Sequence, residues 1–241
     1  MAQRRFWRHE AGMIRAALTE FAIFLRNPRP MSASGLNADG AVARWLVLSV
    51  LQIVVLGLVV MPLILAWQKA FGLPSPNAFD GLSPLALWGG AVLLAPVLEE
   101  LFFRGWMSGR PAALWLTLVV IAGLGLFAAF GRGNPLAAGA IWLGTAIVAG
   151  AAWWRTRRDK QVSATFTRAF PVLFYLVTVL FALMHVFNYP HVSAVVLPMV
   201  LPQFWSGLML GYIRVRLGLL AAILAHVASN AVMLTAALVT G

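Results

Sequence analysis

The sequence contains no cysteine, and charged residues make up only 10% of its 241 positions. The missing thiols exclude disulfide frameworks, thiolate catalysis and zinc or iron sites with cysteine ligands. Soluble domains carry about a quarter charged residues, so this chain has too few to be one. Hydrophobic residues reach 61% instead. They form long runs that do not alternate, which favours membrane-spanning α-helices over a β-barrel.

Seven apolar runs are long enough to cross a bilayer. The first covers 45–67, contains no charged residue and would rise roughly 34 Å, against a hydrocarbon core of about 30 Å. The later runs are 85–107, 112–130, 136–154, 169–187, 193–213 and 217–239. The predicted fold is therefore an all-α polytopic membrane helix bundle of about seven transmembrane helices over 45–241.

Positive charge is concentrated on one side of this predicted bundle. With the N-terminus inside, only Lys69 and Arg132 of the 18 lysines and arginines fall outside. Basic residues prefer the cytoplasmic side, so the bias predicts an N-in, C-out orientation. The net charge of +11 is thus a topology signal and does not indicate nucleic acid as a partner.

The segment 1–44 is predicted to lie on the cytoplasmic side, outside the bundle. Its apolar residues recur at helical spacing, and Pro28 and Pro30 would stop the helix. They are Phe6, Trp7, Met13, Ile14, Ala17, Leu18, Phe21, Phe24 and Leu25. Together with the arginines of the segment, this pattern predicts an amphipathic helix on the membrane surface. A lipid-sensing or partner-binding arm is the alternative.

Ionisable residues inside the apolar runs are costly unless they are paired or line a wet cavity. The run 85–107 contains Glu99, Glu100 and Arg104. Glu100 and Arg104 are four residues apart and can pair on one helix face as structural support. Glu99 is turned by about 100° from Glu100, so it can face a cavity as the chemical carboxylate. The alternative is that both carboxylates lie in the headgroup region.

Two later runs carry histidines with a partner on the same helix face. Phe181 and His185 are four residues apart, with Asn188 one turn later, and His226 and Asn230 repeat the spacing. Counted by helix rise from cytoplasmic basic residues, the Glu99 and His226 levels lie roughly 15–16 Å deep. The same count gives about 21 Å for Asn230 and about 25 Å for His185, a difference that helix tilt could close. We expect these groups to converge.

These motifs together resemble those of the CAAX protease and bacteriocin-processing family of intramembrane endopeptidases. The sequence has Glu-Glu-x-x-x-Arg at 99–104, Phe-x-x-x-His at 181–185 and His-x-x-x-Asn at 226–230, on separate predicted spans. One such motif alone would be weak evidence, but the three in this order are fairly specific. The likeness begins at about residue 85 and extends to the end of the sequence.

The resemblance places a core at about 85–110 and 168–241. In the family the second motif usually lies on the span that follows the first, whereas here two apolar runs intervene. The segment of about 111–167 therefore resembles an inserted hairpin. Because two spans add no net reversal, His185 would still approach from the side that the family needs.

The resemblance implies hydrolysis of a peptide bond in a membrane-embedded or lipid-modified peptide. It implies that Glu99 and His185 activate a water, while His226 and Asn230 hold the oxyanion. Four further residues of the motifs would support the site: Glu100, Arg104, Phe181 and Asn188. The expected partners are membrane lipid and a peptide or protein substrate. The lack of cysteine and the Ala- and Arg-rich composition favour a bacterial cytoplasmic membrane.

Metal dependence stays open at this point. Glu99, His185 and His226 could bind a divalent metal such as Zn²⁺ with an open position for water, or the enzyme could use no cofactor. The sequence lacks His-Glu-x-x-His. The resemblance covers members interpreted both ways.

Rival functions can be compared by residue. A serine-type intramembrane protease needs Gly-x-Ser-Gly, which neither Ser108 nor Ser206 provides. An aspartyl type needs two intramembrane aspartates, but Asp39, Asp80 and Asp159 fall in predicted loops. A scaffold, an immunity protein or a proton-coupled transporter with the same polar cluster is the non-enzymatic alternative.

Overall fold

The computed structural model describes residues 2–240, and within them the side chains other than those of 2–11, 13 and 240. Between residues 2 and 240 all regular structure is helical and no strand occurs. The chain divides into two compact units, one formed by Met1–Phe103 and Phe170–Gly241 and the other by Arg104–Ala169. The predicted hairpin of about 111–167 falls within the second unit.

Six helical stretches of the described chain are long and apolar enough to cross a membrane. They are Ala41–Phe71, Pro84–Ser108, Pro111–Gly131, Pro135–Thr156, Ala164–Asn188 and Leu219–Val239. Each coincides with a predicted span to within a few residues at either end. The predicted all-α polytopic bundle is therefore confirmed, while the count of seven and the N-in, C-out orientation stay predictions.

The predicted span 193–213 differs most from the structure. Its α-helix, α9, covers Leu201–Leu217 and follows a 3₁₀ turn at Leu197–Val200. Pro198 and Pro202 lie in the first positions of these two elements. Proline has no N–H and a fixed φ, so it suits the first turn of a helix. The predicted start at 193 is wrong because apolar content alone does not show where a helix begins.

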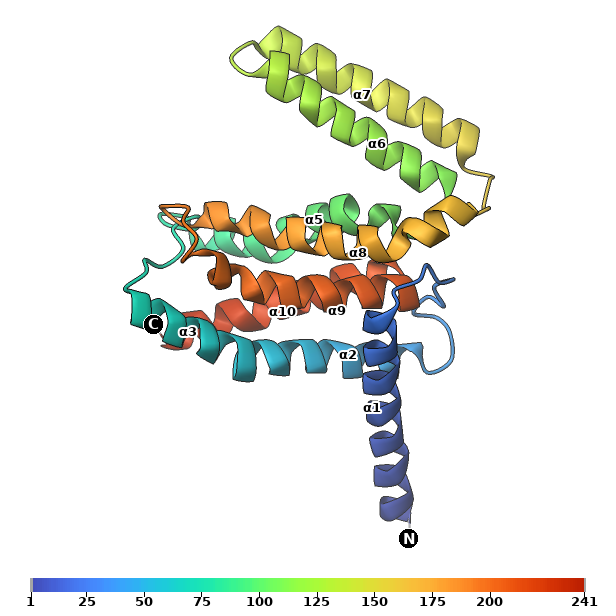
Figure 1. Ribbon diagram of the computed structural model, residues 1–241, viewed down its shortest axis with the longest axis vertical. Helices are drawn as coiled ribbons and strands as arrows, with labels where there is room; N and C mark the ends of the chain where they lie inside the picture. The colour runs from blue at the N-terminus through green and yellow to red at the C-terminus, as the bar shows by residue number, and fades with distance from the viewer. Residues whose placement is uncertain (1, 241) are drawn as a thin grey trace. The chain divides into compact units, whose positions relative to one another are not determined.

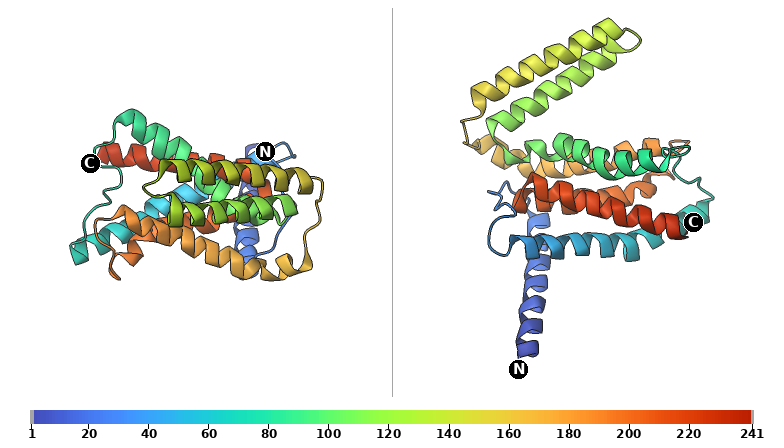
Figure 2. Two further views of the ribbon diagram at one scale, coloured as in Figure 1. Left: turned by 90° about the horizontal axis from the view of Figure 1, so that it is seen from above. Right: turned by 180° about the vertical axis from the view of Figure 1, so that it is seen from behind.

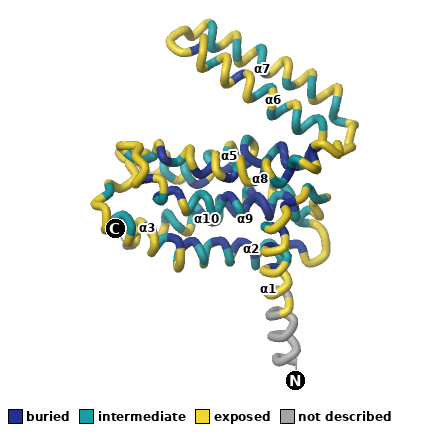
Figure 3. The backbone as a smooth tube through the Cα atoms, viewed as in Figure 1, coloured by how far each residue is buried: buried dark blue, intermediate teal, exposed yellow. Residues whose placement is uncertain are grey.

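The first unit is a bundle in which several helices are interrupted by π-helical turns. It contains α1 (Ala2–Arg26), α2 (Ala41–Val55), α3 (Met61–Phe71), α4 (Pro84–Ala86), most of α5 (Ala95–Arg104), most of α8 (Ala164–Met184), α9 and α10 (Leu219–Thr240). The π-helical turns are η1 (Leu56–Val60) and η2 (Leu87–Leu94). Within this unit α9 packs against both α2 and α10, which lie side by side (Figures 1 and 2). Many residues on α2, α8, α9 and α10 are buried (Figure 3).

Two glycines of α9 allow a close approach of α8. A Cβ atom at Gly211 would lie 2.6 Å from the Phe174 ring, and one at Gly207 would lie 2.9 Å from the Thr178 side chain and 3.5 Å from Phe181. Small residues at a helix interface let the backbones come this near. Residue numbers rise along α8 where they fall along α9, from Phe174 opposite Gly211 to Phe181 opposite Gly207. The two helices therefore run antiparallel.

The second half of α1 runs crosswise to the other helices of the first unit and packs on them (Figure 1). Phe21 and Phe24 are buried and lie 5.3 and 5.1 Å from the Tyr212 ring. The Glu20 carboxylate is 2.6 Å from Arg44 and 3.0 Å from Arg216. These contacts fix α1 against the bundle through one aromatic cluster and one ion-pair cluster.

The helix predicted for the N-terminal segment is present and ends at Arg26, just before Pro28. Ile14 and Leu18 are 46% and 43% exposed, so only part of the predicted apolar face packs on the protein. Phe6, Trp7 and Met13, which were assigned to the same face, lie outside the described side chains. The placement of α1 on the membrane surface stays a prediction.

The second unit is built on two antiparallel helices. After a 3₁₀ turn, η3 (Gly105–Ser108), it contains α6 (Pro111–Leu126), the π-helical turn η4 (Phe127–Gly131) and α7 (Pro135–Thr156). The Asn134 side chain caps α7 by accepting from the Ala137 N–H at 3.1 Å. A Cβ atom at Gly123 would lie 2.5 Å from the Thr145 hydroxyl, so α6 and α7 approach closely.

Candidate functional site

Glu99, on α5, lies between two imidazole rings. Its Oε1 is 3.9 Å from His185 Nε2, just past the end of α8, and its Oε2 is 3.8 Å from His226 Nε2 on α10. A hydrogen bond needs about 2.7–3.2 Å, so neither pair is bonded directly. The structure therefore brings together three residues that were predicted to converge from separate spans, with room for a shared partner.

The site is partly exposed at Glu99 and His185 and buried at His226 and Glu100. The side chains of Glu99 and His185 are 27% and 20% exposed, whereas those of His226 and Glu100 are only 6% and 0% exposed. This burial keeps the surroundings of His226 at low dielectric, where electrostatic interactions are strong.

His185 has a defined tautomer when its ring is neutral. It opens a 3₁₀ turn, η5 (His185–Asn188), and its Nδ1 lies 2.8 Å from the Phe181 carbonyl oxygen. A carbonyl can only accept, so Nδ1 carries the proton and donates it. Nε2 of the neutral ring is then a hydrogen-bond acceptor on the side of Glu99.

His226 is held by Glu100 rather than by a backbone group. Its Nδ1 lies 2.9 Å from Glu100 Oε1, and both side chains are buried. The sequence predicted Glu100 as a partner of Arg104, and the contact with His226 was missed. The 100° offset between adjacent residues was the available signal, because it turns Glu99 and Glu100 toward different neighbours. Arg104 is 2% exposed, and its pairing with Glu100 stays a prediction.

Asn230 is tethered to the π-helical turn η2. Its Nδ2 donates to the Ala91 carbonyl at 2.9 Å. In η2 the Ala95 N–H bonds to the Gly90 carbonyl, five residues back. The next donor in this register would be Pro96, which has no N–H. Asn230 therefore supplies the hydrogen bond that the backbone cannot, and it keeps one further N–H for another acceptor.

Phe181 forms an aromatic wall of the site. The ring is 1% exposed, and its centroid lies 5.0 Å from the His185 ring and 6.2 Å from the His226 ring. Phe103 packs edge-on behind it at 5.2 Å. Asn188, another predicted supporting residue, accepts the Asn77 N–H with its backbone carbonyl at 2.8 Å.

The predicted metal ligands Glu99, His185 and His226 are of the donor types that zinc prefers. Among the side chains that the structure describes, no group of three or more histidine, aspartate or glutamate residues has the closeness of a metal site. A divalent metal held by Glu99, His185 and His226 stays a prediction.

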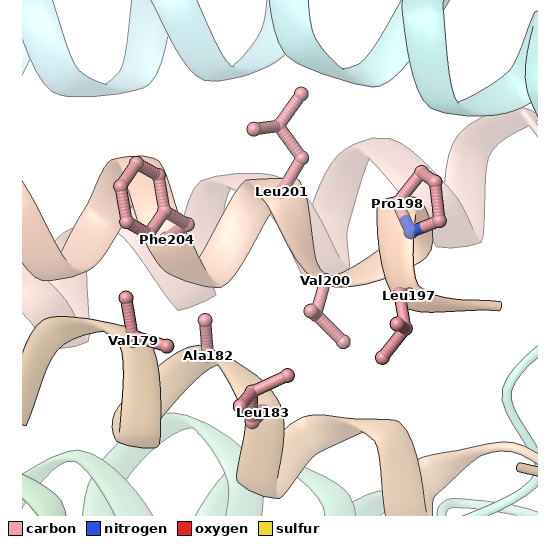
Figure 4. A pocket seen from close by; sticks show the side chains of 8 residues that line it. All are labelled: Val179, Ala182, Leu183, Leu197, Pro198, Val200, Leu201 and Phe204. Atoms are coloured by element: carbon pink, nitrogen blue, oxygen red, sulfur yellow. The ribbon is translucent and has the colours of Figure 1, made fainter. Parts of the chain in front are cut away.

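An apolar cavity of about 200 Å³ lies between α8 and the start of α9 (Figure 4). Its lining is Val179, Ala182, Leu183, Leu197, Pro198, Val200, Leu201 and Phe204. This lining has no ionisable group, so the cavity itself carries no acid–base chemistry. Ala182 and Leu183 are nevertheless close in sequence to Phe181 and His185.

Comparison with known families gives a match to an endopeptidase family. A family model described as Type II CAAX prenyl endopeptidase Rce1-like matches residues 81–163 and 160–232. The matched residues contain all three motifs and the whole of α6 and α7. No curated protein and no solved structure was found to match the chain.

Proposed function

The chain belongs to the Type II CAAX prenyl endopeptidase Rce1-like family, and on this premise we propose that Glu99, His185, His226 and Asn230 form the active site of an intramembrane endopeptidase. Membership confirms the family resemblance that the motifs predicted. It also identifies the protein as an integral multi-pass membrane protein of the CAAX protease class, in contact with lipid and acting on peptides. The roles of single residues and the choice of substrate are the proposal.

The observation that carries the proposal is the position of Glu99 between two imidazole nitrogens. A gap of 3.8–3.9 Å between polar atoms is a place for a bridging water. Glu99 and Nε2 of neutral His185 are both acceptors, and a water has two O–H donors to match them. A water held this way points a lone pair away from both groups, toward an incoming carbonyl carbon.

Hydrolysis then follows by general base catalysis. The water oxygen attacks the carbonyl carbon of the peptide as one of its protons moves to the Glu99 carboxylate. The tetrahedral intermediate collapses, the C–N bond breaks, and Glu99 returns the proton to the leaving nitrogen. His185 keeps the water oriented through the hydrogen bond at Nε2.

The oxyanion of the intermediate is stabilised by His226 and Asn230. His226 donates from Nδ1 to Glu100, so it can also donate from Nε2 only when the ring carries both protons. Asn230 adds its second N–H, already aimed because its first is fixed on Ala91. Preorganised donors of this kind are worth about 10²–10³ in rate each.

The proposed substrate is a peptide that carries a prenylated C-a-a-X terminus, as the family description suggests. The prenyl chain would anchor the peptide in lipid and bring its scissile bond to membrane depth. A soluble peptide without this anchor would reach the site at a far lower local concentration.

Glu99→Gln provides the test, because it keeps the shape of the side chain and removes the base. The protein is reconstituted in lipid vesicles and given an internally quenched prenylated C-a-a-X peptide. We expect Glu99→Gln to reduce kcat by about 10²–10⁴. Glu20→Gln is the matched control, since Glu20 pairs with Arg44 and Arg216 on α1, away from the proposed site, and should keep its activity.

Undiminished cleavage by Glu99→Gln would overturn the proposed role of Glu99. Flux of a solute into the vesicles that depends on pH and on Glu99, without cleavage, would support a transporter instead. Peptidomics of membranes that carry the unaltered protein or Glu99→Gln extends the test to substrates other than the supplied peptide.

A further inference from the structure

Gln203, on α9, has an amide oxygen that the described part of the protein does not satisfy. Its Oε1 is inaccessible to solvent and accepts no hydrogen bond from any part of the chain that the structure describes. Burying an amide oxygen without a partner is unfavourable, because the oxygen loses its hydrogen bonds to water and gains none in the protein. A polar side chain kept at that cost in an apolar helix requires an explanation.

The register of α8 and α9 places Gln203 at the level of His185. Gly211 of α9 faces Phe174 of α8, and one turn away Gly207 faces Thr178 and Phe181. Gln203 is one further turn along the same face of α9. Because the helices are antiparallel, it comes level with the next turn of α8, which contains Ala182 and His185.

The apolar cavity gives independent support for this register. Phe204, which follows Gln203 directly, lines it together with Ala182 of α8 (Figure 4). The α8 and α9 backbones are therefore neighbours at this level. Phe181 and His185 share one face of α8, as Gly207 and Gln203 share one face of α9. By this register, Gln203 lies opposite His185 in the same way that Gly207 lies opposite Phe181.

We propose that Gln203 binds the backbone of the substrate peptide beside the scissile bond. This inference rests on the proposed function. A peptide at membrane depth brings N–H and C=O groups that lipid cannot satisfy. A glutamine amide carries one acceptor and two donors, which complement a peptide unit. Oε1 accepts from a substrate N–H and Nε2 donates to a substrate carbonyl, so the unsatisfied oxygen acquires its partner when substrate binds.

Gln203→Met tests this inference, because methionine has a similar length and no amide. Gln52→Met is the matched control: Gln52, on α2, is also buried with no hydrogen-bond partner for its amide among the described residues. No proposed site residue lies on α2. We expect Gln203→Met to lower kcat/KM for the prenylated C-a-a-X peptide about tenfold, chiefly through KM, and Gln52→Met to change it less than twofold.

A chemical change in the peptide separates a backbone contact from a packing effect. N-methylation of each amide next to the scissile bond removes one N–H at a time. One of these methylations should cost the unaltered protein about tenfold and cost Gln203→Met almost nothing. If Gln203→Met does not fold in detergent, Gln203→Asn takes its place, with an amide one methylene shorter.

The outcomes distinguish this inference from the proposed function. Equal kcat/KM for Gln203→Met and Gln52→Met, or equal losses on N-methylation with and without Gln203, would overturn the role of Gln203 while Glu99-dependent cleavage stands. Absence of Glu99-dependent cleavage by the unaltered protein would overturn the proposed function and this inference with it.

Discussion

Replacing Glu100 by glutamine removes one charge from the buried hydrogen bond that holds His226. The Nδ1–Oε1 distance is 2.9 Å, and Glu100 is fully buried. The glutamine oxygen can still accept from Nδ1, so the orientation of the ring should survive. What is lost is the negative charge beside the ring, and with it the stronger, charge-assisted form of the hydrogen bond that holds His226.

The burial of this pair sets the size of the expected effect. Hydrogen bonds to charged groups are worth about 1.5–3 kcal/mol, and little solvent screening applies to side chains that are 6% and 0% exposed. At about 1.4 kcal/mol for each factor of ten, Glu100→Gln should lower kcat/KM roughly 10- to 150-fold. Glu100→Ala removes the hydrogen-bond partner of the buried His226 imidazole and should cost about 3–5 kcal/mol of stability.

Activity and stability must be measured on the same samples. The vesicle assay gives kcat/KM, and melting in detergent gives the change in stability. Glu100→Gln should melt close to the unaltered protein, whereas Glu100→Ala should melt lower by roughly 2–4 °C for each kcal/mol. Glu20→Gln introduces the same amide in a partly exposed ion pair and should keep full activity. Full activity of Glu100→Gln would refute the proposed need for the Glu100 charge beside His226.

Two further predictions concern backbone geometry. Asn230→Ala leaves the Ala91 carbonyl without the Asn230 donor and should lower both the stability and the activity. Pro96→Ala restores a backbone N–H next to η2. Adding Pro96→Ala to Asn230→Ala should therefore recover part of the melting temperature but not the activity. Gly211→Ala forces a Cβ atom to within 2.6 Å of the Phe174 ring and should destabilise by about 1–3 kcal/mol. The compensating Phe174→Leu should recover most of that loss in thermal melting, and an additive loss in the double variant would contradict this packing.

The spans could be predicted from sequence because lipid imposes a length and an apolar composition on each helix. The start of α9 could not, since α9 is enclosed by other helices and its boundary is marked by prolines rather than by hydropathy. The π-helical turn η2 was not predicted either, although Pro96 lies two residues after its end. The sequence also did not predict that the Asn230 amide, on α10, would donate a hydrogen bond to the Ala91 carbonyl of this turn.

The candidate site was predictable as a set of residues and less so as a set of contacts. Motif spacing identified Glu99, His185 and His226, which the structure brings together. Counting helix rise put His185 about 9 Å deeper than Glu99, yet their side chains are 3.9 Å apart. Such counts assume parallel helices that start at one level. The contact between Glu100 and His226 depends on how α5 and α10 are rotated, which no single sequence motif specifies.

The adjacency of Glu99 and Glu100 makes the α5 helix intolerant of a change in phase. Inserting or deleting one residue between 95 and 98 would rotate everything after it by about 100°. That rotation would carry one carboxylate toward the place of the other and leave an imidazole without its proper neighbour. Length variation in homologous chains should therefore be found in the loop between α3 and α4, and be absent from the first turn of α5.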